Sequence, residues 1–123
     1  YGNEDIAGGI DKFWLSSSLQ ISPNEQVEFL KKFYTGTLPI SKRSTEIVKD
    51  ILLLEKTDSY KLSAKTGAGP LENGKYLGWY VGYLERNDNV YFFATNIEGD
   101  SFTSIRDKRI ELTKKVFTKL GLM

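Results

Sequence analysis

Lys65, Thr66 and Gly67 are the residues of this 123-residue chain whose types and spacing best suit chemistry. They stand where the stretch "YKLSAKTGAGP" passes from strand-like alternation into a glycine-rich turn. A cation, a hydroxyl and a glycine add little to a core when they lie at the rim of a sheet, but together they can hold an anionic group. We therefore expect a strand that ends at a ligand-binding site.

The absence of histidine and cysteine limits the reactions in which the chain could take part. Without histidine there is no Ser-His-Asp triad, no imidazole base and almost no transition-metal site. Without cysteine there is no thiol nucleophile, disulfide or cysteine-type zinc site. A lysine or a carboxylate must therefore handle the protons of any nucleophilic mechanism. The formal net charge of +1 gives no long-range attraction to nucleic acid, and we expect no metal and no membrane span.

Sequence patterns predict one domain made of helices and a sheet. Ser22, Pro23 and Glu25 form a capping box at the start of a helix, and Gly36 ends that helix. After Lys56 the hydrophobic period changes from about 3.6 to about 2, which is typical of strands. We predict helices over 23–34, about 42–54 and 103–120, and strands over 60–66, 76–85 and 90–97.

The three predicted strands form an antiparallel meander, and the alternating strand directions bring two cations to the same edge of the sheet. A tight polar turn at 86–89 joins the second strand to the third. Because antiparallel strands alternate in direction, the strand carrying Lys65 ends at the rim where the last helix begins. Arg106, in the first turn of that helix, is therefore expected near Lys65, although 41 positions (106 minus 65) separate them. Two cations at one edge indicate an anionic ligand, and we expect a carboxylate.

Two predicted helices carry apolar stripes, and the last one also carries a basic face. The stripe of the second helix consists of Ile47, Val48, Ile51 and Leu52, and that of the last helix consists of Ile105, Leu112, Val116 and Leu120. The cations of the last helix are typical of a solvated face and do not indicate nucleic-acid binding; they are Lys108, Arg109, Lys114, Lys115 and Lys119. Gly78 and Gly82, in the second strand, indicate close approach of a helix or another backbone.

Several stretches together resemble the class D serine β-lactamases, the oxacillinase family. They are "YGNEDIAGGIDKFWLSSSLQISPNEQVEFL", "KTGAG", "LGWYVGYLE" and "VYFFATNI". The Tyr-Gly-Asn, Phe-Trp-Leu and Lys-Thr-Gly elements occur in the family's order and approximate spacing, and the resemblance covers essentially all 123 residues. It implies an α+β fold of the β-lactamase and penicillin-binding transpeptidase type, in which helices pack an antiparallel sheet.

The resemblance implies a substrate-binding role for the Lys-Thr-Gly segment. Lys65, Thr66 and Gly67 match the third family motif, where the lysine charge and the strand edge hold a β-lactam antibiotic. The backbone N–H of Ala68 would be one of two oxyanion-hole donors. Arg106 resembles the arginine that pairs with the substrate carboxylate, in agreement with the parity argument.

The resemblance assigns further site residues to the start of the chain. Tyr1, Gly2 and Asn3 match a motif at the edge of the active-site cleft. Trp14 matches the tryptophan whose indole N–H supports a carboxylated lysine, the family's general base, and Leu15 resembles its apolar neighbour over the reaction centre. Without the resemblance, Trp14 reads as a core aromatic and Tyr1 and Asn3 as turn residues.

The chain departs from the family pattern because it contains no Ser-x-x-Lys element. We expect residues 1–123 to be the C-terminal half of a single domain, inactive alone, whose partner is the half that carries the serine and the lysine carbamate formed with CO2. The strand over 90–97 would then lie beside strands of that half, and alone it would be an exposed edge. The family implies a periplasmic or secreted protein, and a homodimer stays open.

Two other interpretations stay open. A β-lactam sensor domain shares this fold and is acylated without turnover, although "FWLSSSLQISPNEQV" favours the enzyme. A catalytically dead domain kept for binding is the third interpretation. Taken singly, Lys65 also fits an ordinary exposed strand lysine and Arg106 a helix-surface charge, and only their predicted convergence indicates a site. Ser16, Ser17 and Ser18 have no base spaced to activate them, and we interpret them as a polar loop.

Overall fold

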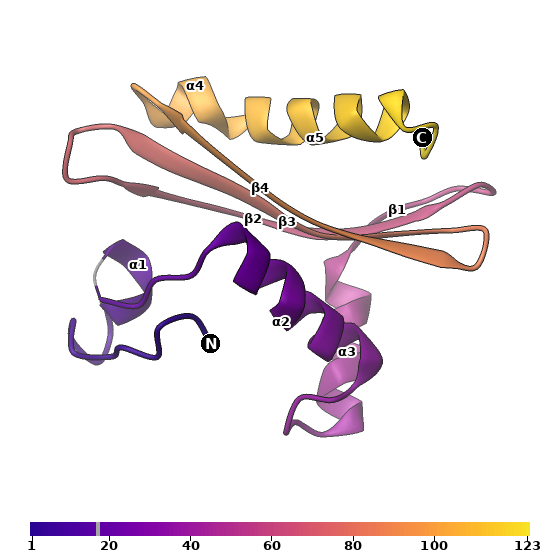
Figure 1. The fold of residues 1–123 in the computed structure, drawn as a ribbon, viewed down its shortest axis with the longest axis horizontal. Helices are drawn as coiled ribbons and strands as arrows, with labels where there is room; N and C mark the ends of the chain where they lie inside the picture. Colours follow the sequence, from indigo (N-terminus) through magenta and orange to yellow (C-terminus); the bar gives the residue numbers. More distant parts are fainter. Residues whose placement is uncertain (17) are drawn as a thin grey trace.

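The chain folds into a four-stranded antiparallel sheet with helices on both faces (Figure 1). The computed structural model describes residues 1–16 and 18–123. The strand order is β1-β2-β3-β4, and α4 and α5 cover one face while α1, α2 and α3 lie on the other. This arrangement confirms the predicted α+β class. The elements are α1 (Phe13–Ser16), α2 (Pro23–Thr35), α3 (Lys42–Leu52), β1 (Leu53–Lys56), β2 (Lys61–Pro70), β3 (Tyr76–Arg86), β4 (Asn89–Gly99), α4 (Phe102–Arg106) and α5 (Lys108–Lys119).

Local sequence signals set the ends of α2 and the hairpin between β3 and β4. The Ser22 hydroxyl accepts from the Glu25 backbone N–H, and the Glu25 carboxylate accepts from the Ser22 N–H at 2.8 Å, which confirms the capping box. Gly36 ends the helix at φ 72°. Asn87 and Asp88 have φ values of 50° and 63°, the left-handed conformation that a type I′ hairpin turn requires at both central positions.

One strand prediction and one helix prediction are wrong in their bounds. β2 does not end at Thr66 but runs through Gly67 to Pro70, because these residues pair with β3 in an unbroken register from Lys61↔Glu85 to Pro70↔Tyr76. The glycine-rich stretch is therefore strand, and the turn follows at 71–75 around Gly74, whose φ is 80°. Leu53 and Leu54, which were expected to end the second helix, instead belong to the short edge strand β1 (Leu53–Lys56).

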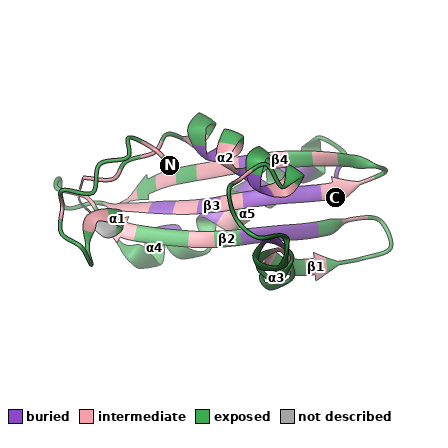
Figure 2. Ribbon diagram, turned by 90° about the horizontal axis from the view of Figure 1, so that it is seen from below, coloured by how far each residue is buried: buried purple, intermediate pink, exposed green. Residues whose placement is uncertain are grey.

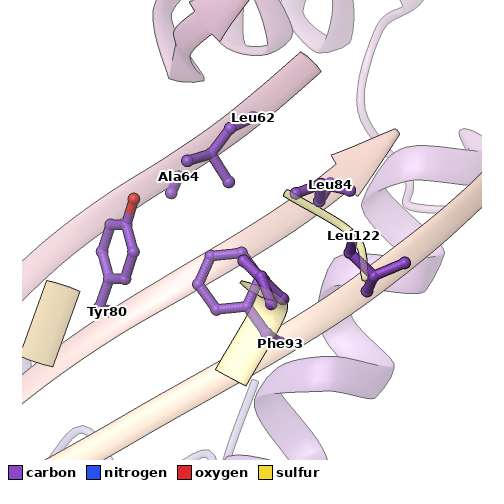
Figure 3. Close-up of a cluster of buried hydrophobic side chains, with 7 residues drawn as sticks. Leu62, Ala64, Tyr80, Leu84, Phe93 and Leu122 are labelled. Carbon is purple, nitrogen blue, oxygen red and sulfur yellow. The ribbon is translucent and has the colours of Figure 1, made fainter. Parts of the chain in front are cut away.

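The core lies between the sheet and α5. Six side chains from the strands and the C-terminal end point toward one another (Figure 3), and Phe93 also meets Phe117 of α5 edge-on with ring centroids 5.2 Å apart. On the opposite face, the Tyr34 ring of α2 packs edge-on against Tyr83 and Phe92. The α5-side cluster consists of Leu62, Ala64, Tyr80, Leu84, Phe93, Phe117 and Leu122.

The predicted apolar stripes of the last two helices are mostly exposed. The expected single helix over 103–120 divides at Asp107 into α4 and α5, and its buried positions are Ile105, Arg109, Thr113 and Phe117. Leu112, Val116 and Leu120, which were expected to pack on the sheet, are 37%, 53% and 66% exposed. The prediction failed because two polar residues with buried hydrogen bonds, Arg109 and Thr113, take the packed face.

The second helix, α3, likewise turns its apolar residues outward. Ile47 and Ile51 are 46% and 71% exposed, and Figure 2 shows most of α3 in the exposed colour. Lys49 of the same helix donates to the Tyr34 carbonyl at 2.7 Å and lies over the Tyr34 ring. No helix in the described part of the chain is long and apolar enough to cross a membrane.

Candidate active site

The Lys-Thr-Gly segment lies on a part of β2 whose outer edge has no strand partner among the described residues. β1 pairs with β2 only from Lys61 to Ser63, so the edge beyond Ser63 leaves backbone groups available. Gly67 and Ala68 are exposed. A free strand edge can bind an extended ligand through main-chain hydrogen bonds. The backbone geometry therefore suits a ligand that lies along Gly67 and Ala68.

Lys65 reaches this segment from the face that α1 and α2 cover. Leu62 and Ala64 pack in the cluster beneath α5, and side chains alternate along a strand, so Lys65 lies on the opposite face. Its side chain is exposed, and Nζ donates to the Thr66 carbonyl at 2.7 Å. The ammonium group is thus held beside the motif and remains open to solvent.

Arg109 reaches the same segment from the α5 face. Its Nη1 donates to the Gly67 carbonyl at 2.6 Å, and the residue is only 5% exposed. The prediction that Arg109 belongs to a solvated basic face is therefore wrong. Its Nε is buried without a hydrogen-bond partner, and no carboxylate of the described residues forms an ion pair with its guanidinium.

Arg106, the residue that parity and resemblance both selected, has a different neighbour. It ends α4 rather than opening the last helix, and its Nη2 lies 3.0 Å from a carboxylate oxygen of Asp107. Both side chains are exposed, and the hydrogen bond from Arg106 lowers the pKa of the Asp107 carboxyl. Parity placed the start of the last helical segment at the correct rim, but the cation that reaches the motif lies three positions further along the chain (109 minus 106).

One sequence signal did indicate the position of Arg109. Gly78 was expected to mark the close approach of a helix, and a Cβ atom built there would lie 3.0 Å from Ile105 Cδ1 and 3.3 Å from Arg109 Cδ. This prediction is confirmed. The packed helix could therefore be inferred from β3, although the identity of the residue that crosses the glycine could not.

Trp14 lies in α1, which packs against β2. Its side chain is 53% exposed and meets the Phe13 ring edge-on, with centroids 4.8 Å apart. The interpretation of Trp14 as a core aromatic is therefore wrong. The side chains of Leu15 and Ser16, and the whole of Ser17, lie outside the described residues.

Hydrogen bonds from the Tyr-Gly-Asn motif hold the start of the chain against the segment before α2. The Asn3 side chain donates to the Ser18 carbonyl at 2.8 Å and accepts from the Gln20 N–H at 3.0 Å. Gly2 has φ 58°, and any side chain there would collide with the Gln20 carbonyl. The Tyr1 hydroxyl donates to Gln26 Oε1 at 2.5 Å, and burial raises the Tyr1 pKa. These contacts give the motif a structural role.

The fold and the free Lys-Thr-Gly edge define a class of protein, and comparison with known families agrees. Residues 1–120 match the family described as "Penicillin binding protein transpeptidase domain". The chain belongs to this family. Within the described residues, no group of three histidine, cysteine, aspartate or glutamate side chains could hold a metal ion.

Individual relatives narrow the resemblance to class D β-lactamases. The chain is 45% identical over 115 residues to "Probable beta-lactamase YbxI" of Bacillus subtilis, covering 94% of this chain and 42% of that protein. The class D β-lactamase YbXI structure from Nostoc superposes with a TM-score of 0.92 at 44% identity, covering 100% of this chain and 52% of the other. "Regulatory protein BlaR1" of Bacillus licheniformis is 39% identical over 122 residues, covering 99% and 20%. The chain thus spans about half of the class D β-lactamases it matches.

Proposed function

We propose that this chain is the substrate-carboxylate-binding part of a class D serine β-lactamase, which opens β-lactam rings through a serine acyl-enzyme. The observation that carries the proposal is the buried Arg109, which has no carboxylate partner among the described residues and lies against the Lys-Thr-Gly strand. A buried charge without a counterion is unfavourable by several kcal/mol in rough terms. An anionic ligand at this edge would offset that energy.

The two cations support a ligand with one carboxylate beside a reactive carbonyl. Lys65 and Arg109 approach one strand segment from opposite faces, so a carboxylate at the edge would meet positive charge from both. β-Lactam antibiotics carry such a carboxylate next to the lactam ring. We therefore assign carboxylate binding to Arg109 in place of Arg106, with Lys65, Thr66 and Gly67 around it.

The remaining roles follow from the free edge of β2. The Ala68 N–H would donate to the developing oxyanion, and removing one such donor typically lowers kcat by about 10²–10³-fold. The serine nucleophile and the lysine that carries CO2 as its carbamate would lie outside this chain. The Trp14 indole N–H would support that carbamate. The 123 residues alone would then be inactive, and the family context points to a periplasmic or secreted protein.

A β-lactam sensor is the second candidate, because one matched relative is the regulatory protein BlaR1. Both candidates are acylated at serine, but only the enzyme releases the acyl group with water. Intact-mass spectrometry of the full-length protein with benzylpenicillin, followed from seconds to hours, separates them. We expect an adduct that forms and disappears as the penicillin is consumed; an adduct that persists would replace the enzyme proposal with the sensor.

The role of Arg109 can be tested in the same protein by comparing Arg109→Ala with Arg106→Ala. Loss of a buried cation that binds the substrate carboxylate should lower kcat/KM for benzylpenicillin by about 30-fold or more, equivalent to about 2 kcal/mol. Arg106→Ala removes an exposed arginine of similar sequence context and should leave kcat/KM within about twofold. The opposite ranking would restore Arg106 as the carboxylate ligand.

A further inference from the structure

We infer that Gly78 is a positioning residue for substrate binding, because its missing side chain provides the path by which Arg109 crosses β3 to reach β2. This inference rests on the proposed carboxylate-binding role of Arg109. Gly78 pairs with Ala68 of β2 on one side and with Ile97 of β4 on the other, so it lies in β3 directly beside the residue that follows the Lys-Thr-Gly motif. Its closest side-chain neighbours belong to Ile105 and Arg109.

Space is the physical reason for glycine at this position. A Cβ atom at Gly78 would lie 3.0 Å from Ile105 Cδ1, 3.3 Å from Ile105 Cβ and 3.3 Å from Arg109 Cδ. The φ of Gly78 is not among the positive values, so its backbone is open to any residue. Glycine in a strand interior weakens the strand, so its presence here needs an offsetting gain. The gain is room for Ile105 of α4 and a direct route for the Arg109 side chain.

The backbone of Arg109 is fixed, so the side chain cannot avoid an obstacle by moving the helix. The Thr113 hydroxyl donates to the Arg109 carbonyl at 2.8 Å, and Thr113 is 4% exposed. Thr95 of β4 lies 2.7 Å from the Thr113 hydroxyl oxygen. Because the single Thr113 proton is already used, Thr95 must be the donor in this contact. These two bonds join α5 to β4 at the turn from which Arg109 projects.

The consequence is that a methyl group at position 78 would displace the guanidinium of Arg109, besides pressing on Ile105 of α4. Arg109 Cδ is in the middle of its side chain, and displacing it by a few tenths of an ångström shifts the Nη1 atom that contacts Gly67 at 2.6 Å. Ile105 meets the new methyl group at Cδ1, the end of its side chain, and also at Cβ, which is fixed to α4, so part of the strain falls on α4. A substitution at Gly78 should therefore lower the affinity for substrate by displacing Arg109.

The test is steady-state kinetics of the full-length protein with Gly78→Ala, using benzylpenicillin and its methyl ester. For benzylpenicillin we expect KM to rise about tenfold with kcat changed less than threefold, the loss typical of one weakened charge-assisted hydrogen bond. For the ester, which lacks the carboxylate, we expect KM to change less than twofold. Equal effects on both substrates would overturn the inference, since a general packing defect would act on both.

Two further variants separate an effect on the position of Arg109, read from KM, from an effect on protein stability, read from the melting temperature. Gly99→Ala places a Cβ 2.6 Å from Ile105 Cγ2 and 2.5 Å from Ser104 Oγ, and none of its three nearest atoms belongs to Arg109, so it should lower the melting temperature but keep the wild-type KM. Adding Ile105→Val to Gly78→Ala removes the 3.0 Å contact with Cδ1, the closest of the three, and should recover part of the lost stability while KM stays high. Recovery of both quantities would refute positioning through Arg109.

The same assays distinguish this inference from the proposed function. If Arg109→Ala does not discriminate between the acid and the ester, the carboxylate-binding role itself is wrong. If Arg109→Ala discriminates and Gly78→Ala does not, only the inference about Gly78 fails.

Discussion

Replacing Arg109 by methionine should make the protein more stable and less active. Methionine is flexible enough to follow the arginine path over β3 without burying a charge. The substitution removes a buried Nε that has no hydrogen-bond partner, and such a group typically costs about 1–3 kcal/mol. The Gly67 carbonyl that loses its donor belongs to an exposed residue and can be hydrated instead. We therefore expect a gain of about 1–3 kcal/mol in the free energy of unfolding.

The assay is chemical denaturation of the full-length protein together with benzylpenicillin hydrolysis. In a domain of 150–250 residues each kcal/mol corresponds to a shift of about 2–4 °C in melting temperature, which calorimetry can detect. Arg106→Met is the matched control, since it changes an exposed arginine and should shift stability by less than about 0.5 kcal/mol. A loss of more than about 1 kcal/mol in Arg109→Met would refute the reasoning, because it would show that the buried charge is already compensated within the fold.

Three further perturbations test other parts of the structure. Phe117→Ala removes the ring that meets Phe93 in the core and should lower the unfolding free energy by about 3–5 kcal/mol, measured by urea denaturation; a loss below about 1 kcal/mol would contradict the packing. The hydrogen bond from Lys114 lowers the pKa of Glu55, so its stabilising contribution is present above the ordinary carboxyl pKa and is lost as pH falls through the lowered value. Glu55→Gln should therefore destabilise at neutral pH and converge with wild type in acid, as melting curves between pH 7 and 3 would show; a constant difference would contradict this linkage. Asn3→Ala deletes a side chain that donates once and accepts twice, and limited proteolysis should then cleave the segment before α2 faster than in wild type; an unchanged rate would show that these bonds do not hold the segment.

Sequence reasoning succeeded where short-range chemistry decides the structure. The capping box at Ser22 and Glu25 depends on residues three positions apart, and the turn at Asn87 and Asp88 depends on two residues that tolerate positive φ. Both can be read without knowledge of the rest of the molecule. The strand alternation and the meander followed from these local signals.

The predictions from sequence failed where long-range packing overrides local conformational preference. Gly67 is a weak strand former, yet pairing with Trp79 keeps it in β2. Arg109 is expected to face water, yet it is buried because Gly78 leaves room for it and the Gly67 carbonyl accepts a hydrogen bond from its guanidinium. Choosing between Arg106 and Arg109 required the break between α4 and α5 at Asp107 and the rotation of α5 about its axis, which the stripe of Leu112 and Val116 indicated wrongly.

Under the proposed β-lactamase function, the approach of positive charge from both faces of the sheet has a consequence for evolution under antibiotics. Substitutions around Lys65 alter an exposed strand, where most changes are nearly neutral for folding. Substitutions around Arg109 alter a packed helix that hydroxyl groups join to β4. Selection for a new antibiotic range can therefore proceed in small steps on the Lys65 side, whereas on the Arg109 side each step must also preserve the packing of α5.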